Sequence, residues 1–249
     1  MKKKVLVCGC LGHMGQLVVE AVNASSDMVV LCGFDKSIDL TGMFNFPVFH
    51  EVAQINAKPD IIIDFSSPTA TEIISKYAYE NDIPIVVATT GLSEEQIHKL
   101  HEYSDKIPVF QSANMSLEVV VFTKLLKEYS TILGKNADIE ILEKHHNRKA
   151  DNPSGTAKML FSAVNSAFNN EKKMIYGRTG KREKDEIGLA SLRGGNIVGE
   201  HTVSFFSENE TFSISHTAYS RMVFAEGSVR AARYLFNYAS GFYNMNDLV

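Results

Sequence analysis

The feature of this sequence that most constrains its fold is the alternation of short apolar runs and helical segments over about the first 110 residues. The apolar runs are rich in valine and isoleucine, and residues with helical periodicity follow them, which is typical of βαβ units around a parallel sheet. Because the runs are almost continuously apolar, we expect helices to cover both faces of the sheet. The predicted strands are 4–8, 28–34, 60–65, 83–88 and 109–110. This pattern predicts a Rossmann-like, doubly wound α/β domain.

The pattern changes after Asn114. Long strands follow one another there, which indicates a second domain of the α+β class. The polar, lysine-rich residues 169–188 are expected to form a surface loop. The predicted elements are helices at 117–133, 156–168 and 224–236 and strands at 138–143, 190–193, 198–206 and 211–218, the last two joined as a hairpin. We expect the last helix to return to the first domain.

Charge and composition argue against several classes of protein. The formal net charge is −4, whereas a general nucleic-acid binder carries a basic surface. No apolar run approaches the roughly 20 residues of a membrane span, and the first run breaks at Gly9, too early for a secretion signal. Cys8, Cys10 and Cys32 form no disulfide framework, which favours the cytoplasm. Cys8 and Cys10 lack a second pair at metal-ligand spacing, so we expect buried thiols and no metal.

A glycine-rich turn follows the first predicted strand and leads into a helix. Glycines let a backbone turn tightly and approach a pyrophosphate, which binds at the helix N-terminus. The spacing departs from G-x-G-x-x-G because Leu11 stands where the second glycine would be. A plain tight turn is the alternative, but the place after the first strand favours a dinucleotide site. Its candidate residues are Gly9, Cys10, Leu11, Gly12, His13 and Met14.

Polar groups also end the other predicted strands, where ligands of parallel sheets bind. Asp35 lies about 20 residues beyond the loop, where an acid binds the adenosine ribose of NAD. Lys36 beside it suits the extra phosphate of NADP, so the pair leaves the choice between NADH and NADPH open. Candidates for the nicotinamide half of the crevice are Phe65, Ser66, Thr89 and Thr90, with ordinary turn chemistry as the alternative.

The stretch EKHHNRKADNPSGTAKML at 143–160 combines imidazoles and cations with a helix start. Pro153 and Ser154 are typical of a helix N-terminus, where the amides of Gly155 and Thr156 are placed to bind a small anion such as a carboxylate. Lys149 lies close in sequence and adds a positive charge. The stretch therefore predicts an anion site.

Two adjacent histidines, His145 and His146, precede this anion site. Adjacent strand residues point to opposite faces, so one imidazole can face a ligand. With a pKa near ~6.5, an imidazole donates a proton at neutral pH, as a hydride acceptor requires. A structural histidine is the alternative, which the cluster with Lys149 makes less favoured. A metal pair is disfavoured because the two side chains diverge and no third ligand is evident.

Together these residues resemble the signature of the dihydrodipicolinate reductase (4-hydroxy-tetrahydrodipicolinate reductase) family. The most specific block is Glu143-x-His145-His146-x-x-Lys149-x-Asp151-x-Pro153-Ser154-Gly155-Thr156-Ala157. Other similar blocks, in order, are Gly9-x-x-Gly12-x-Met14-Gly15, Ala88-Thr89-Thr90-Gly91, Ala113-Asn114-Met115-Ser116, Arg193-x-Gly195-x-Ile197-Val198-Gly199-Glu200-His201 and Ser220-Arg221-x-x-Phe224-Ala225. The resemblance spans nearly the whole chain. It departs at Ala88, where glycine is expected, and at Met115, where phenylalanine is common.

The resemblance implies reduction of a cyclic dicarboxylate of the lysine and diaminopimelate pathway by NADPH or NADH. It implies a dinucleotide-binding domain over 1–114 and 222–249, and a substrate-binding domain over 115–221 that builds a homotetramer. His145 is implied as the proton donor and Lys149 as its substrate-binding or proton-donating partner. His146, Gly155 and Thr156 are implied to bind a substrate carboxylate. The implied cofactor residues are Gly9 to Met14, Asp35, Lys36, Phe65, Ser66, Ala88, Thr89, Thr90, Ser112, Ala113, Asn114, Met115 and Arg221.

Two other functions remain as alternatives. One is another two-domain NAD(P)-dependent reductase, although a semialdehyde dehydrogenase would need an acylating cysteine in the second domain, and every cysteine lies before residue 33. The other is a protein that senses a dinucleotide without turnover. Such a protein lacks a complete proton donor and anion site. For an enzyme, we expect closure of the two domains to complete the site.

Overall fold

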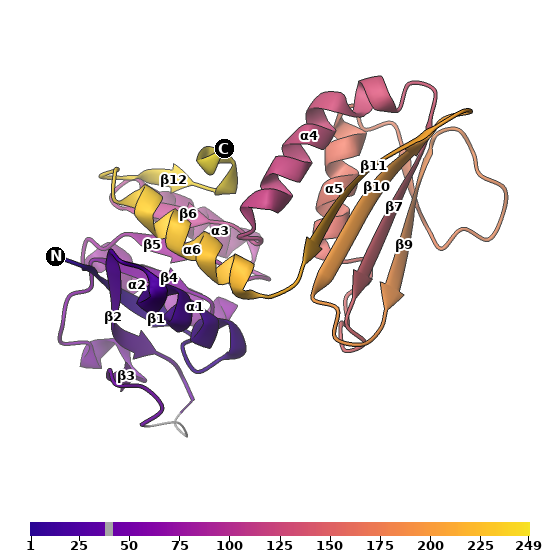
Figure 1. Cartoon of the computed structure of the whole chain (residues 1–249). Helices are drawn as coiled ribbons and strands as arrows, with labels where there is room; N and C mark the ends of the chain where they lie inside the picture. Colours follow the sequence, from indigo (N-terminus) through magenta and orange to yellow (C-terminus); the bar gives the residue numbers. More distant parts are fainter. Residues whose placement is uncertain (38–41) are drawn as a thin grey trace. The chain divides into compact units, whose positions relative to one another are not determined.

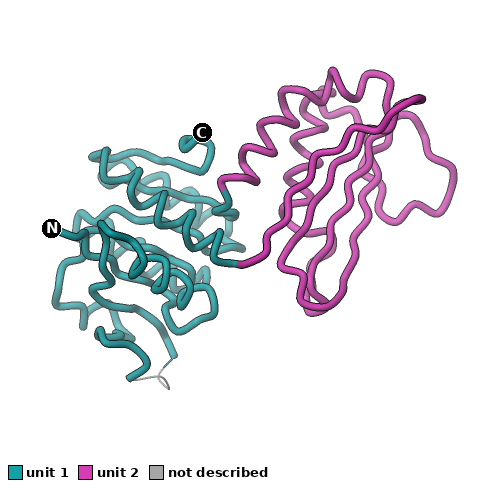
Figure 2. The backbone as a smooth tube through the Cα atoms, viewed as in Figure 1, with its two compact units in different colours: residues 1–116, 221–249 teal, residues 117–220 magenta. Residues whose placement is uncertain are grey.

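The computed structural model describes residues 1–37 and 42–249 (Figure 1). They form two compact units, Met1–Ser116 with Arg221–Val249 and Leu117–Ser220, which Figure 2 colours separately. Both ends of the chain therefore belong to the first unit. Among the described residues, no helix is long and apolar enough to cross a membrane.

The first unit is built on a seven-stranded sheet whose paired strands are all parallel. The strand order is β12-β6-β5-β4-β1-β2-β3, so the connections run to opposite sides of β1. Ligands of such sheets bind outside the carboxyl ends of the strands at this switch point, here between β1 and β4. The strands are β1 (Lys3–Cys8), β2 (Met28–Phe34), β3 (Val48–Phe49), β4 (Ile61–Asp64), β5 (Ile85–Val87), β6 (Pro108–Gln111) and β12 (Gly241–Tyr243).

Helices cover both faces of this sheet (Figure 1). Helix α1 (His13–Ala24) packs with α6 (Met222–Leu235), and α2 (Pro68–Glu80) packs with α3 (Glu94–Ser104). Leu6 and Ile62 lie in the apolar cluster that includes α2 and α3, and their strand neighbours are equally buried. Continuous burial along the strands explains their continuously apolar sequences. The predicted Rossmann-like domain is confirmed.

The second unit holds a mixed five-stranded sheet in the order β11-β10-β7-β9-β8. Strand β10 (Gly199–Phe206) pairs antiparallel with β11 (Thr211–Ala218) and with β7 (Asp138–His145). Strand β9 (Glu186–Arg193) pairs parallel with β7 and with β8 (Lys173–Tyr176). Helices α4 (Leu117–Leu133) and α5 (Gly155–Ser166) lie together on one face of the sheet (Figure 1). The predicted α+β class of this domain is confirmed.

One face of the second sheet carries the core and the other does not. Along β7, Ile139, Ile141, Glu143 and His145 are buried, whereas the residues between them are more exposed. Phe122 and Leu126 of α4 and Leu160 and Val164 of α5 join the two isoleucines in one apolar cluster. This two-residue alternation is typical of a strand that is covered on one face only. It places Glu143 and His145 on the face that the helices cover.

The prediction of a surface loop over 169–188 is wrong for the residues that form strands. Residues 173–176 form strand β8, and β9 already begins at Glu186. The segment between them is tied to β7 by Arg178, whose Nη2 lies 2.8 Å from Glu140 Oε1, and by Arg182, whose Nη1 lies 2.7 Å from Asp138 Oδ1. Short strands with charged flanks show no clear alternation, so the polar composition concealed them.

Candidate active site

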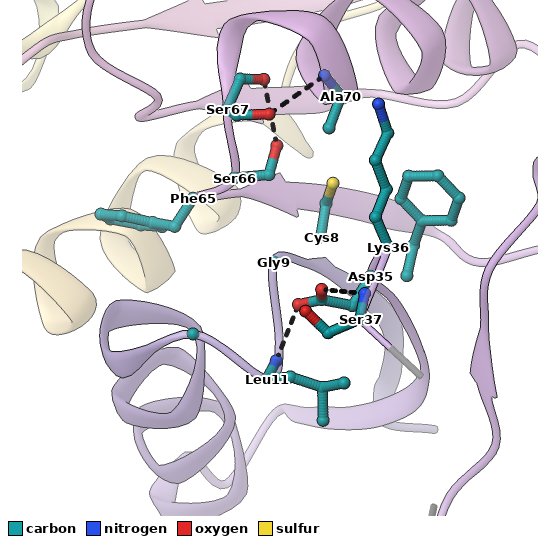
Figure 3. A pocket seen from close by; sticks show the side chains of 12 residues that line it. Cys8, Gly9, Leu11, Asp35, Lys36, Ser37, Phe65, Ser66, Ser67 and Ala70 are labelled. Carbon is teal, nitrogen blue, oxygen red and sulfur yellow. Dashed lines mark hydrogen bonds between the residues drawn. The ribbon is translucent and has the colours of Figure 1, made fainter. Parts of the chain in front are cut away.

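A pocket of about 310 Å³ lies at the carboxyl ends of β1, β2 and β4 in the first unit (Figure 3). It therefore occupies the switch point of the parallel sheet, where a dinucleotide is expected to bind. Its lining includes seven of the predicted cofactor residues: Gly9, Leu11, Gly12, Asp35, Lys36, Phe65 and Ser66. Cys8, Phe34, Ser37, Ser67 and Ala70 complete the lining.

Close approach explains why the loop after β1 needs its glycines. Gly9 has a φ of +78°, and a Cβ on it would stand 2.5 Å from the carbonyl oxygen of Phe65. A Cβ on Gly15 would stand 1.9 Å from the carbonyl oxygen of Gly9. The loop is therefore pressed between β4 and the start of α1. Gly12 is the N-cap of α1 and provides no side-chain acceptor, so the helix end suits a pyrophosphate.

Asp35 and Lys36 both line this pocket, and Asp35 is held there by two backbone amides (Figure 3). Asp35 Oδ2 accepts a hydrogen bond from the Leu11 amide at 3.0 Å, and Oδ1 accepts one from the Ser37 amide at 3.0 Å. The carboxylate thus links the end of β2 to the glycine loop. Leu11 stands where the motif would have its second glycine. It contributes to this link through its backbone amide, a donor that any residue except proline provides.

A buried carboxylate that sequence reasoning missed organises the ends of β4 and β5. Asp64 Oδ1 accepts from the Ser66 hydroxyl at 2.5 Å, and Oδ2 accepts from Thr71 Oγ1 at 2.5 Å and Thr89 Oγ1 at 3.0 Å. Burial raises the pKa of Asp64, although these hydrogen bonds oppose the shift. The Ser66 amide also donates to Thr89 Oγ1 at 3.0 Å, so Asp64 sets the positions of two predicted cofactor residues.

The remaining predicted cofactor residues lie in the first unit but do not line the pocket. Cys10 is fully buried, and burial raises the pKa of its thiol to about 12. Met115 is also buried, and α6 approaches it so closely that a Cβ on Gly227 would stand 1.8 Å from the Met115 oxygen. The others are His13 and Met14 at the start of α1, Ala88, Thr89 and Thr90 after β5, Ser112, Ala113 and Asn114 after β6, and Arg221 at the N-cap of α6.

The second cluster of candidate residues lies at the end of β7 in the second unit. His145 is 8% exposed, and its Nδ1 lies within hydrogen-bond distance of Glu143 Oε2. Burial lowers the pKa of His145, while the hydrogen bond and charge of Glu143 oppose that shift. Lys149 and Arg193 lower the pKa further by charge repulsion. The imidazole is therefore poised by one anion and two cations.

Glu143 is completely buried and makes a two-pronged pair with Arg193. Arg193 Nη2 donates to Oε1 at 2.8 Å and Nη1 donates to Oε2 at 3.0 Å, while the Ser154 amide donates to Oε1 at 3.1 Å. Although burial alone would raise the pKa of Glu143, these donors and His145 lower it to about 2. A buried carboxylate held in this way stays ionised at neutral pH.

His201 links this carboxylate group to the start of α5. It lies opposite Glu143 in the β7–β10 pairing, and its Nε2 is 3.1 Å from Ser154 Oγ. Ser154 is the N-cap of α5, and its Oγ accepts the Ala157 amide at 3.1 Å. The rings of His145 and His201 meet edge to face at 5.1 Å between centroids. Burial, and then the neighbouring His145, lower the pKa of His201 to about 4.

The predicted anion-site residues surround the turn between β7 and α5. Lys149 Nζ lies 2.8 Å from Asp151 Oδ1, and the Lys149 side chain is 21% exposed. Gly155 begins α5, as the sequence predicts, with Thr156 next to it. His146 follows the last residue of β7 and is half-buried. One strand, one turn and one helix start thus bring the predicted catalytic and substrate residues into a single segment.

Glu143, His145 and His201 offer ligand atoms that all lie within 4.8 Å of one another, which is a geometry that can hold a metal ion. The guanidinium of Arg193, however, already occupies both oxygens of Glu143. A cation inserted there would displace or face this positive group, which Coulomb repulsion opposes. The chemistry of the donor set therefore fits a hydrogen-bonded network better than a metal site.

Three residues of this network had no assigned role in the sequence analysis: Glu143, Arg193 and His201. Ser154 was expected only as a helix cap. Glu143 was detectable, because it stands two residues before His145 and so shares its strand face. Arg193 and His201 are distant in sequence and reach Glu143 only through the pairings of β9 and β10 with β7. No spacing in the sequence specifies those registers.

Comparison with known proteins identifies relatives over the whole chain. Residues 3–115 match the family model described as "Dihydrodipicolinate reductase, N-terminus", and residues 118–249 match "Dihydrodipicolinate reductase, C-terminus". The chain is 41% identical over 248 residues to 4-hydroxy-tetrahydrodipicolinate reductase of Clostridium novyi (strain NT), covering 99% of this chain and 98% of the relative. It is 42% identical over 252 residues to the protein of that name from Caldanaerobacter subterraneus subsp. tengcongensis, covering 100% and 99%.

A solved structure supports the same fold. It is the dipicolinate-bound dihydrodipicolinate reductase from Paenisporosarcina sp. TG-14, which superposes with a TM-score of 0.84 over 100% of both chains at 22% identity.

Proposed function

The chain belongs to the dihydrodipicolinate reductase family, and from that premise we propose that it reduces 4-hydroxy-tetrahydrodipicolinate with NADH or NADPH in lysine and diaminopimelate biosynthesis. The observation that carries the proposal is the segment from β7 to α5. It joins a buried histidine on a carboxylate, a lysine and a helix N-terminus within one turn. This combination suits a substrate that carries carboxylates and needs a proton.

The pocket of the first unit fits the dinucleotide. Its glycine loop leaves no room for side chains at Gly9 and Gly15, and the start of α1 offers amides to a pyrophosphate. Asp35 and Lys36 are assigned to the adenosine ribose, Phe65 and Ser66 to the nicotinamide half. The other assigned residues are Cys10, Leu11, Gly12, His13, Met14, Ala88, Thr89, Thr90, Ser112, Ala113, Asn114, Met115 and Arg221. When bound, the reduced nicotinamide supplies a hydride.

The substrate is assigned to the second unit. Lys149 attracts a carboxylate by charge, and His146 with the amides of Gly155 and Thr156 binds carboxylate oxygens. Bound carboxylates hold the ring in one orientation, which accounts for part of the catalysis. His145 then donates a proton to the ring carbon beside the one that receives the hydride.

The direct test is to follow nicotinamide absorbance with enzymatically generated substrate and each cofactor in turn. His145→Ala is expected to keep cofactor affinity and lose about 100-fold or more in kcat. Lys149→Ala is expected to raise the KM for substrate and to lower kcat. Unchanged turnover in either variant would remove its assigned role. Cofactor binding by the wild-type protein without any turnover would instead favour a dinucleotide sensor.

Two finer assignments follow from the resemblance. We propose a homotetramer, supported by the face of the second sheet that neither α4 nor α5 covers (Figure 1). We also propose a cytoplasmic location. Its support is that all three cysteines are unpaired and buried, as expected in a reducing compartment.

A further inference from the structure

The two ring nitrogens of His145 stand in different surroundings. Nδ1 meets the buried carboxylate of Glu143. Nε2 points past Gly199 of β10, where an added Cβ would stand only 3.1 Å from it. The backbone conformation of Gly199 is one that other residues adopt, so its glycine is explained by space rather than by backbone strain.

We infer that Glu143 and Arg193 are positioning residues that make Nε2 of His145 the proton-donating atom, and that Gly199 keeps that atom accessible. This inference rests on the proposed function, because it specifies the atom that acts in that reaction.

The hydrogen-bond pattern of Glu143 fixes the proton positions on the imidazole. An ionised carboxylate only accepts, and Glu143 already accepts two bonds from Arg193 and one from the Ser154 amide. His145 Nδ1 must therefore be the donor in its contact with Glu143. In the neutral imidazole Nε2 is then bare, and in the imidazolium Nε2 carries the mobile proton.

The proton and electron balance follows from this arrangement. In the proposed reaction the 4-hydroxyl group of the substrate leaves as water, which gives a conjugated dihydro ring. When bound, the reduced nicotinamide would supply the hydride that forms one C–H bond on this ring, so the cofactor would be oxidised and the ring reduced by two electrons. The Nε2–H bond of the imidazolium breaks, and its proton forms the second C–H bond on the neighbouring ring carbon. His145 is left neutral, with its remaining proton on Nδ1 and hydrogen-bonded to Glu143, and solvent restores the proton on Nε2.

Arg193 makes Glu143 a stable partner for His145. Its bidentate pair keeps the carboxylate ionised despite complete burial, and its Nη2 also donates to the Asp151 carbonyl at 2.9 Å. The charged groups that face His145 are thus Glu143, Arg193, Lys149 and, when protonated, His201. Among them only Glu143 is negative, so it alone favours the imidazolium.

The first test is Glu143→Gln. The new amide donates toward Nδ1, so neutral His145 is expected to change to the tautomer with its proton on Nε2. The imidazolium also loses its anion. We expect kcat to fall by about 100-fold or more and the KM for NADH to stay within about twofold. The alkaline limb of the kcat profile, where the imidazolium loses its proton, is expected to move to lower pH. Glu140→Gln is the matched control on the uncovered face of the same strand, with kcat expected within about twofold.

The tautomer is measured directly from ring ¹⁵N shifts of histidine-labelled protein, with His145 identified by the signal lost in His145→Ala. A wild-type neutral imidazole with its proton on Nε2 would overturn the inference, and so would Glu143→Gln with unchanged kcat and pH profile. The tautomer is read without turnover. Absent reductase activity in the wild type would therefore reject the proposed function separately.

Gly199→Ala tests the role of Nε2 without touching Glu143. Its methyl group crowds Nε2, so kcat is expected to fall about tenfold or more while NADH affinity is unchanged. Gly194→Ala is the control, because no atom lies within 4 Å of the Cβ it would add. Full activity in Gly199→Ala would show that Nε2 is not the donor.

Discussion

Asp35 is held beside the glycine loop by two backbone amides, so its charge stays at the pocket rim. Asp35→Asn removes that charge and leaves Lys36 in place. We expect the ratio of kcat/KM for NADPH to that for NADH to rise about tenfold, because a 2′-phosphate no longer meets a carboxylate. Steady-state kinetics with both cofactors measures the ratio. Asp60→Asn, a control before β4, should leave it unchanged, and an unchanged ratio in Asp35→Asn would contradict the assignment.

His201 makes the stability of the protein depend on pH. Its folded pKa is about 4, below the ordinary value of 6.5, so the unfolded chain binds more protons between these values. Stability is therefore present above about pH 6.5 and decreases as the pH falls towards about 4. From the shift we expect a loss of roughly 2 kcal/mol between about pH 7.5 and about pH 5.

The comparison of His201→Gln with the wild type isolates this effect. Urea unfolding at the two pH values is expected to show a pH dependence smaller by roughly 2 kcal/mol in the variant. The exposed His98 of α3, changed to Gln, should leave the dependence as in the wild type. Equal pH dependence in wild type and His201→Gln would show that this imidazole is not the buried neutral base.

The cap residue of α5, Ser154, has two roles: it caps the helix and it belongs to the network around Glu143. Ser154 Oγ accepts the Ala157 amide and contacts His201, and the residue is 2% exposed. Ser154→Ala therefore removes a cap and a buried partner, at a cost of roughly 2 kcal/mol. Ser93→Ala removes only the cap of α3, where Ser93 Oγ accepts the Gln96 amide at 3.2 Å, and should cost about 1 kcal/mol. Thermal unfolding that shows equal losses would contradict the additional role of Ser154.

The periodicity of apolar residues predicted the long elements and those that are buried either on one side or completely. Strand β7 alternates over eight residues, and β1 is a continuous apolar run, so both were visible in the sequence. Strands β3 and β12 have two and three residues, which is too short for any period to show. They form because β2 and β6 offer them an open edge, and pairing of that kind depends on the assembled sheet.

The candidate site also has a part that the sequence predicts and a part that it does not. His145, Lys149 and Gly155 lie within one turn of chain, so their proximity was predictable from spacing. Arg193 reaches Glu143 because β9 runs parallel to β7 with His145 opposite Arg193. That register depends on packing of the whole second sheet, which no local pattern encodes.

The chain leaves the first unit after Ser116 and re-enters it at Arg221, so the second unit is an insertion in the first. Helix α6 closes the insertion, because Gly227 allows its backbone to touch Met115 just before the exit point. The first unit therefore needs residues from both ends of the sequence to complete its sheet. This arrangement explains why the last helix and β12 pack with strands more than 100 residues earlier in the chain.

The uncovered face of the second sheet predicts the assembly of the protein. Phe206 is 43% exposed on that face, and hydroxyl pairs link Thr202 with Ser215 at 2.9 Å and Ser204 with Ser213 at 2.8 Å beside it. A wide sheet face without a covering layer buries its apolar groups when copies of the chain meet. Phe206→Glu would place a charge in the contact of the proposed homotetramer, so we expect this variant to form smaller species in light scattering after size exclusion.

Phe212 provides the matched control for this prediction. It is 49% exposed but lies opposite Phe205, which belongs to the buried core, and so it points to the helix-covered side of the sheet. Phe212→Glu is therefore expected to keep the wild-type mass. If both variants stay tetrameric, the contact uses another surface, and if both dissociate, the effect comes from the hairpin rather than from the face. Assembly through the uncovered face is supported only if Phe206→Glu dissociates the protein and Phe212→Glu does not. The two side chains differ chiefly in the face of the sheet that they occupy.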